Sequence, residues 1–329
     1  METQKLFFQQ IKAALPSHLS LVDEVAELLG ISYDSAYRRI RGDKILSLDE
    51  LQILGSKFSI SLDTLLSLKN NNIVFRDFMI GPEGIGIKDW LRVILMDMQR
   101  IHAAKEKVIM YSAKDPPLFH YFQVPEIGAF KTFFWQKTLL QFPEFEDKQF
   151  SLASVDDEIQ ELGMQCLAKY VRVPTIELWN VDTFIIAFSQ MEYYYVSGLF
   201  ENKDDIYVLC DKFDSWLRHI QRQAELGFKF IYGTDPIGVE DNFKLYLNEV
   251  VLNDNSIYVK MDDQCVTYIT DNVLSLLITT NPVFCAHKRK FLNGLCQKSS
   301  LISHVNAKER GRFFNRLLHR IDEFKETIR

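Results

Sequence analysis

The sequence predicts a mainly α-helical protein with an α+β C-terminal part. We expect an N-terminal domain of five helices, then a larger domain of helices around a small, mostly antiparallel sheet. Apolar residues recur at helical spacing through the first 68 residues, between capping residues and glycines. Longer helical patterns dominate between residues 88 and 226. After residue 242, short runs rich in Val, Ile, Tyr and Phe alternate with turn residues, which is typical of strands.

Local signals mark each of the five N-terminal helices. Gly30 permits the positive φ of a sharp turn after the second helix, and Ser32 is a good N-cap for the third. Gly42 ends the third helix, and Ser47 with Glu50 has the spacing of a capping box for the fourth. We therefore expect helices at Gln4–Leu15, Leu21–Leu29, Tyr33–Ile40, Ser47–Phe58 and Ser61–Leu68.

A linker is predicted after these helices. Asn70–Asn72 and Gly81–Gly86 are rich in turn-forming residues. The segment between them, Ile73–Ile80, is apolar enough to be a strand or to pack on the first domain. This pattern divides the chain into a domain at residues 1–69, a linker at 70–87 and an α+β domain at 88–329.

The larger domain combines helices with short strands. The apolar run Lys107–Ser112 suits a buried strand that joins the later sheet, which makes residues 88–329 one α+β unit with inserted helices. Val273–Thr279 fits either a strand or a short helix. An antiparallel meander is predicted from the runs Phe243–Leu252, Ser256–Met261 and Gln264–Thr270. The predicted helices are Lys88–Lys105, Glu126–Gln141, Val155–Tyr170, Thr175–Phe200, Ile206–Leu226, Asn281–Cys296 and Ala307–Ile328.

Composition bounds the class of protein. A length of 329 residues suggests two or three domains, and 25% charged with 47% apolar residues is ordinary for a globular protein. Five scattered cysteines fit buried thiols in a reducing cytosol. Neither a signal peptide nor an apolar stretch long enough to span a bilayer is visible. We therefore expect a cytoplasmic protein with no membrane partner.

The net charge of −6 is unevenly distributed. Residues 1–69 carry −1 and residues 286–329 carry +7, which leaves −12 for residues 70–285. An acidic body of this kind repels DNA wherever basic side chains do not cluster. The sequence therefore argues against unselective coating of nucleic acid.

The strongest group of functional side chains surrounds the third helix. Short polar groups near the N-terminus of such a helix can reach base edges and phosphates, and long cations can reach guanine or the backbone. Arg38 can offer a bidentate fork, whereas Arg41 and Lys44, past the helix end, suit phosphates. The predicted DNA-binding residues are Ser32, Tyr33, Asp34, Ser35, Tyr37, Arg38, Arg39, Arg41 and Lys44.

Residues 20–66 resemble the DNA-binding domain of the Cro and phage-repressor type, a lambda-repressor-like helix-turn-helix. The motifs Gly30-Ile31-Ser32, Arg41-Gly42, Ser47-Leu48-Asp49 and Ser61 to Leu66 fall where that family's motifs fall. The resemblance implies that the third helix enters a DNA groove. This chain departs from the family at Arg39, where a buried aliphatic residue is usual. Whether Arg38 or Arg39 faces the bases is therefore open.

Other side chains have two interpretations each. The basic C-terminal residues could touch DNA phosphates or an anionic ligand, or form a solvated face that balances the acidic middle or pairs across a dimer. They are His287, Lys288, Arg289, Lys290, Lys308, Arg310, Arg312, Arg316 and Arg320. The aromatic runs Phe119–Phe122, Phe133–Trp135 and Tyr193–Tyr195 could line an effector pocket but are more often core or interface. His102 and His120 lack partners at metal-ligand spacing.

Enzyme motifs are not found. Gly84-Ile85-Gly86 lacks the third glycine and the preceding strand of a dinucleotide fingerprint. The sequence contains no nucleophile elbow, phosphate-binding loop, HExxH or paired-cysteine pattern. We expect no enzyme activity, no cofactor and no metal.

The resulting hypothesis is a transcription regulator that binds double-stranded DNA sequence-specifically. It is expected to act as a homodimer, because paired half-sites strengthen the limited affinity of one small helix. The larger domain would supply dimerisation and sensing of a small-molecule or protein effector. The alternative is a protein-interaction module whose helical N-terminus does not bind DNA.

Overall fold

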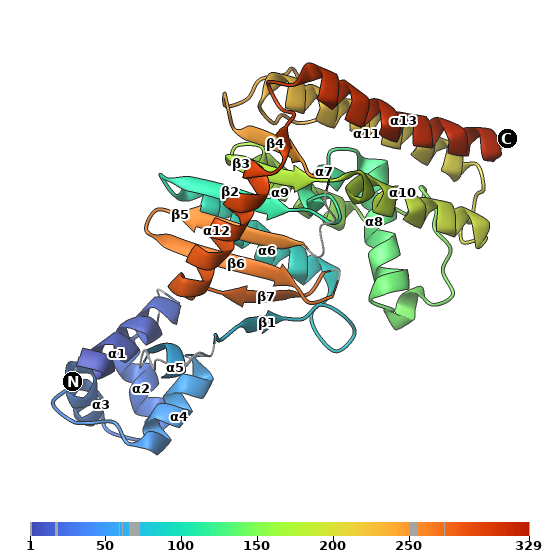
Figure 1. Ribbon diagram of the computed structural model, residues 1–329. Coiled ribbons are helices and arrows are strands. Elements are labelled where there is room, and N and C mark those ends of the chain that lie inside the picture. The colour runs from blue at the N-terminus through green and yellow to red at the C-terminus, as the bar shows by residue number, and fades with distance from the viewer. Residues whose placement is uncertain are drawn as a thin grey trace. The chain divides into compact units, whose positions relative to one another are not determined.

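The computed structural model describes residues 2–16, 19–58, 60, 62–65, 73–249, 255–272 and 274–328 (Figure 1). The chain divides into two compact units, Met1–Val74 and Phe75–Arg329. The first unit is helical where described, and the second combines helices with one sheet. The fold class is therefore mixed α/β.

The first unit is built around one apolar core. Phe7, Ile11, Val25, Ala36 and Leu54 are all fully buried in it. Helices lie at the predicted places, with ends that differ by a residue or two: α1 (Glu2–Ala14), α2 (Leu21–Leu29), α3 (Tyr33–Arg41), α4 (Leu48–Lys57) and α5 (Leu62–Leu65). The predicted cap Ser61, the predicted helix end at Leu66–Leu68 and the turn Asn70–Asn72 lie outside the described residues.

The described strands of the second unit form one mixed sheet in the order β1-β7-β6-β5-β2-β3-β4-β8. The pairs β2–β3 and β3–β4 are parallel, and all other neighbours are antiparallel. The sheet is thus mostly antiparallel, as predicted, but it is not small. Its strands are β1 (Arg76–Phe78), β2 (Lys107–Ser112), β3 (Thr175–Trp179), β4 (Phe243–Leu247), β5 (Ser256–Met261), β6 (Gln264–Thr270), β7 (Leu276–Thr279) and β8 (Ser300–Leu301).

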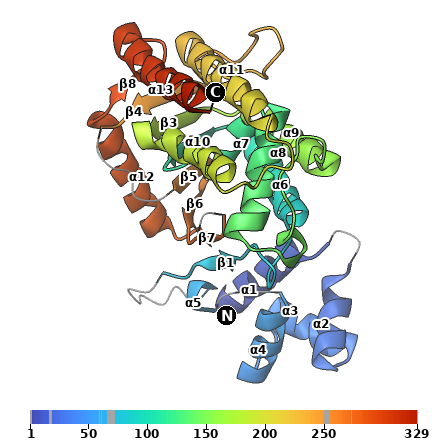
Figure 2. The same ribbon diagram turned by 90° about the vertical axis from the view of Figure 1, so that its right-hand side faces the viewer.

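Helices cover both faces of the sheet (Figures 1 and 2). Successive side chains of β2 pack against them in alternation. Ile109 packs with buried residues of α6 (Ile87–Ala103) and α9 (Asp157–Tyr170). Its neighbour Met110 points to the other face and packs against α12 (Pro282–Gln297). This is the period of two that a strand buried on both faces requires.

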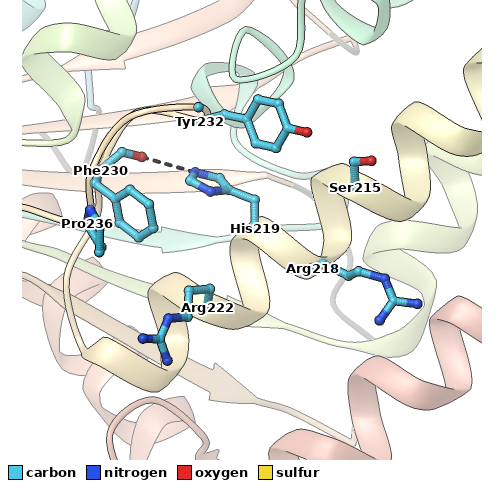
Figure 3. Close-up of a pocket in the computed structure, with 8 residues that line it drawn as sticks. Ser215, Arg218, His219, Arg222, Phe230, Tyr232 and Pro236 are labelled. Carbon is cyan, nitrogen blue, oxygen red and sulfur yellow. Dashed lines mark hydrogen bonds between the residues drawn. The ribbon is translucent and has the colours of Figure 1, made fainter.

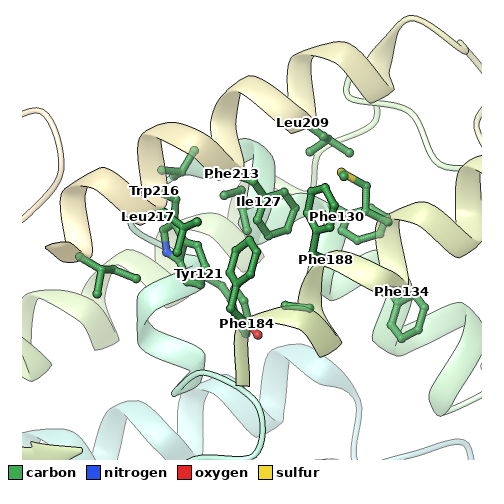
Figure 4. Close-up of a cluster of buried hydrophobic side chains, with 14 of the residues drawn as sticks. Tyr121, Ile127, Phe130, Phe134, Phe184, Phe188, Leu209, Phe213, Trp216 and Leu217 are labelled. Atoms are coloured by element: carbon green, nitrogen blue, oxygen red, sulfur yellow. The ribbon is translucent and has the colours of Figure 1, made fainter. Parts of the chain in front are cut away.

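A second group of helices packs through aromatic side chains (Figure 4). The rings of Tyr121 and Trp216 are stacked with centroids 5.6 Å apart, and Phe184 stacks on Phe188 at 5.7 Å. The predicted aromatic runs therefore belong mainly to the core, although Tyr193 is exposed. The helices involved are α7 (Leu118–Tyr121), α8 (Pro125–Phe134) with a π-helical continuation Trp135–Leu139, α10 (Val181–Val196), α11 (Asp205–Leu226) and α13 (Ala307–Thr327).

Two predictions for the second unit need correction. The predicted helix Thr175–Phe200 begins instead with β3, because this apolar stretch is buried between β2 and β4 and its helix opens only at the cap Asn180. The first strand of the predicted meander, β4, is not adjacent to β5. It pairs with β3 and β8 and is separated from β5 by two strands. The open choice at Ile73–Ile80 includes a strand, and Arg76–Phe78 forms one, β1, which pairs with β7. The open choice at Val273–Thr279 resolves as a strand, β7.

The C-terminal basic helix largely balances acidic side chains of its own unit. Arg320 pairs with Glu192 of α10 at 2.6 Å, and Lys325 pairs with Asp211 of α11 at the same distance. Arg310 is buried and donates to the carbonyls of Ile302 and Val305. In the described part of the chain, every helix is too short or too polar to cross a lipid bilayer.

Candidate nucleic-acid interface

The turn between α2 and α3 is fixed by backbone bonds and a cap. Gly30 has φ +61°, and the amide of Ile31 donates to the carbonyl of Ala26 at 3.0 Å. Ser32 then caps α3: its Oγ accepts from the amide of Ser35 at 3.3 Å and donates to the Ser35 hydroxyl at 3.1 Å. α3 is thus held firmly at its beginning.

Backbone and side-chain bonds fix the other end of α3. Gly42 adopts φ +86°, and the amides of Asp43 and Lys44 both donate to the carbonyl of Arg38, at 2.8 and 3.2 Å. Gln4 of α1 donates from Nε2 to the carbonyls of Arg39 (2.7 Å) and Lys44 (2.8 Å). Its Oε1 accepts from the Leu46 amide at 3.2 Å. One α1 side chain therefore holds the loop that follows α3.

Arg39 lies on the buried face of α3, not with the other predicted site residues. It is 5% exposed, and its guanidinium donates to both Glu50 carboxylate oxygens, the shortest bond being 2.6 Å. Nη1 also donates to the carbonyl of Ser35 at 3.1 Å. We therefore remove Arg39 from the set of DNA-contacting candidates. The Arg39 side chain itself occupies this buried position, and Glu50 supplies the opposite charge that it needs there.

The opposite face of α3 is uncovered. Tyr33, Tyr37 and Arg41 follow at helical spacing, and the two tyrosines are 64% and 51% exposed. Ser32, Asp34, Arg38 and Lys44 are also exposed, and Ser35 is half-buried. The structure thus brings all predicted site residues except Arg39 to one surface.

The arginines of this surface have different surroundings. The Arg41 guanidinium lies 5.4 Å from the centre of the Tyr37 ring and donates to Asp43 Oδ2 at 2.7 Å. The Arg38 guanidinium has no hydrogen-bond or ion-pair partner in the described part of the chain. Arg38 is therefore the more available donor, whereas Arg41 already has two of its N–H groups engaged by Asp43.

Sequence reasoning overlooked Gln4 and the second role of Glu50. Glu50 was recognised in a capping box, which the structure contains: Ser47 Oγ accepts from the Glu50 amide at 3.2 Å, and Glu50 Oε2 accepts from the Ser47 amide at 3.0 Å. The ion pair with Arg39 is additional. An arginine in an apolar helix position was the available signal, because such a buried charge needs an opposite partner.

The second unit contains a buried polar network around Glu177. Glu177 accepts from His120 Nε2 (3.0 Å), the Tyr170 hydroxyl (2.5 Å) and Trp179 Nε1 (2.9 Å). The Lys229 ammonium donates to Thr175 Oγ1 at 2.7 Å and to two backbone carbonyls. These bonds tie β3 to its neighbours. Among the described residues, no cluster of His, Cys, Asp and Glu side chains could hold a metal ion.

Comparison with known proteins adds no assignment: no family model, curated protein or solved structure matches this chain. Any function must therefore be argued from the side chains themselves.

Proposed function

We propose that this chain is a transcription regulator that binds double-stranded DNA sequence-specifically, with α2 and α3 acting as a helix-turn-helix. The observation that carries the proposal is the uncovered face of α3, with Tyr33, Tyr37, Arg38 and Arg41 on a helix fixed at both ends. A helix of this length fits a major groove about 12 Å wide. A rigid presentation lowers the entropy lost on binding.

The side chains have distinct proposed roles. Arg38, which lacks a partner in the described chain, is placed to read a base by a bidentate contact. Arg41 and Lys44 lie at and beyond the helix end and are placed for phosphates. Ser32 and Ser35 at the helix start can donate hydroxyl protons to phosphates or bases. Asp34 and Asp43 reduce the positive charge of the surface, which favours selective over unselective binding.

The proposal includes a homodimer. One short recognition helix with three cations gives limited affinity, and two linked copies multiply it when their half-sites are about one helical turn apart. The second unit would then supply self-association and respond to an effector. A two-fold arrangement predicts an operator with palindromic halves.

The direct test is selection of bound sequences from a random DNA pool with the full chain. The expected result is a palindromic consensus whose affinity falls steeply with salt, because cations on the protein replace counterions on DNA. A pool that shows no enrichment at low salt would overturn the proposal.

A second candidate is a protein-interaction module. Ile45 and Leu48, which follow α3, are 73% and 83% exposed, and exposed apolar side chains beside tyrosines suit a protein partner. The variant Leu48→Asp separates the two functions. Absence of DNA selection by the natural chain, with loss of a protein partner in this variant, would support the second candidate in place of the first.

A further inference from the structure

An exposed apolar loop stands beside a pocket in the second unit. All residues from 232 to 241 are exposed, and the loop contains Ile237 at 81% and Val239 at 51% exposure. Contact of these side chains with a partner would remove apolar surface from water. The loop connects α11 to β4.

The pocket has a volume of about 460 Å³ and lies between α11 and this loop (Figure 3). α11 contributes one face of side chains, and the loop contributes aromatic and apolar groups. The His219 imidazole at its base bonds to the carbonyl of Phe230 at 3.1 Å, and burial lowers the pKa of His219 to about 4, so the ring is neutral near pH 7. The lining residues are Ser215, Arg218, His219, Arg222, Phe230, Tyr232, Gly233 and Pro236.

The base of the loop is rigid. The Phe230 carbonyl accepts from Gln123 Nε2 at 3.0 Å and Gln223 Nε2 at 2.7 Å, and the Tyr232 amide donates to Gln123 Oε1 at 2.8 Å. Gly238 lies so close to the Phe228 ring that an added Cβ would be 2.3 Å from its Cδ2. The start of the loop is therefore anchored to Gln123 and to α11.

Charges on the two sides of the pocket are complementary. The loop carries Asp235, Glu240 and Asp241, none of which has an ion-pair partner in the described part of the chain. The α11 side carries Arg218, paired with Asp214, and Arg222, paired with Glu225. Their remaining guanidinium N–H groups (Nη1 of Arg218, Nε and Nη2 of Arg222) have no acceptor among the described residues. Each arginine can thus bind a second carboxylate.

We propose that the occupant of this pocket is the loop of a second copy of this chain. Ile237 of each copy inserts into the pocket of the other, and its acidic flanks contact Arg218 and Arg222. The projecting loop lies next to the pocket on the same surface. This arrangement suits a two-fold symmetric contact, in which the loop of each copy enters the pocket of the other. The inference deepens the proposed function by naming a surface for the expected homodimer.

Sedimentation velocity of the full chain without DNA tests the inference, so its failure is separate from failure of DNA binding. We expect a dimer at tens of micromolar for the natural chain. Ile237→Asp should raise the dimer dissociation constant at least tenfold, because it removes the apolar side chain that fills the pocket. Val283→Asp, which changes a residue of similar exposure (76%) on α12, is the matched control and should remain dimeric.

A charge exchange gives the sharper test. The variant Arg218→Glu/Arg222→Glu has two acidic surfaces, and the variant Asp235→Arg/Glu240→Arg has two basic ones. Each should be monomeric alone because like charges meet, whereas an equimolar mixture should form a heterodimer. Recovery in the mixture also shows that both variants are folded. A natural chain that is monomeric at 100 µM, or a dimer unaffected by Ile237→Asp and both charge reversals, would overturn the inference.

Discussion

Arg39 of α3 and Glu50 of α4 are joined by an ion pair with a shortest distance of 2.6 Å, and the arginine side chain is almost fully buried. Glu50 also completes the capping box of α4. A single carboxylate therefore holds the start of one helix and the buried face of another. The orientation of the exposed face of α3 depends on this pair.

Removal of the arginine should destabilise the first unit. Arg39→Ala leaves Glu50 without its partner, and loss of one member of a buried pair costs about 3 kcal/mol. Hydrogen exchange of peptides from α3 and α4 is the suitable measurement, because all four tryptophans lie in the second unit and fluorescence would not report the change. Arg38→Ala, an exposed neighbour, is the control and should change exchange little. Equal protection in both variants would contradict the structural role of Arg39.

The same pair predicts a pH dependence. The hydrogen bond from Arg39 lowers the pKa of Glu50, whereas an unfolded glutamate titrates near ~4.3. The unfolded chain then binds more protons than the folded one as the pH falls below that value, so the stabilisation is present above about pH 5 and is lost in acid. Glu50→Gln should be less stable than the natural chain at pH 7, and the difference should shrink towards pH 3. A difference that does not vary with pH would contradict this account.

Substitution of the exposed arginines should separate base reading from phosphate binding. Arg38→Ala should cost about 1–3 kcal/mol on the selected operator and relax the preference at one base position. Arg41→Ala should weaken all sequences alike and lower the salt slope by about 1. Operator affinity and its salt dependence, measured by fluorescence anisotropy, distinguish these effects.

The control for these variants removes the same charge elsewhere in the first unit. Lys12 and Lys57 are exposed on α1 and α4. Lys12→Ala and Lys57→Ala should preserve the consensus and most of the affinity. If the double variant Arg38→Ala/Arg41→Ala keeps the natural operator affinity, α3 is not the recognition helix.

Gly163 of α9 tests the packing of the second unit. A Cβ at this position would lie 2.1 Å from Cδ1 of the buried Phe122 ring, so Gly163→Ala should destabilise by about 1–3 kcal/mol. Gly311 of α13 has open space around it, and Gly311→Ala should stabilise by about 0.5–1 kcal/mol through helix propensity. Urea unfolding followed by tryptophan fluorescence measures both. Equal shifts in the same direction would refute the steric argument.

Lys229 gives the second unit a pH dependence of its own. Burial lowers its pKa to about 7, whereas an unfolded lysine titrates near ~10.4. Between these values the unfolded chain binds more protons, so this lysine makes stability rise with pH from 7 to about 10. Lys229→Met should be destabilised by unpaired carbonyls at every pH, but should lack that rise. Urea midpoints of the two proteins across this range provide the comparison.

The sequence predicted best what local chemistry determines. The caps Ser32 and Ser47 and the turn at Gly30 depend on hydrogen bonds between residues close in sequence. Each is therefore predictable from the neighbouring residues. The exposed face of α3 follows from the same helical period. Arg39 could not be placed in this way, since its burial depends on Glu50 eleven residues later.

The remaining errors concern contacts between distant segments. β3 has the apolar composition of the helix that follows it, and its position between β2 and β4 is visible only in the sheet. The choice for Ile73–Ile80 also depends on a distant segment, because β1 is three residues long and is defined by pairing with β7, where Phe78 lies opposite Leu276. The loop around Ile237 carried no motif, and its position next to Arg218 and Arg222 arises from the fold.

The strand order of the sheet has a consequence during synthesis on the ribosome. Phe78 of β1 pairs with Leu276 of β7, which is synthesised on the order of 10–40 s later at roughly 5–20 residues per second. The core of the first unit, by contrast, is formed in the described part of the chain by residues up to Leu65. During synthesis the helical unit can therefore fold while the strands of the second unit still have unpaired edges. Such edges can pair with strands of neighbouring chains. The net charge of −12 on residues 70–285 opposes that encounter by mutual repulsion while the sheet is incomplete.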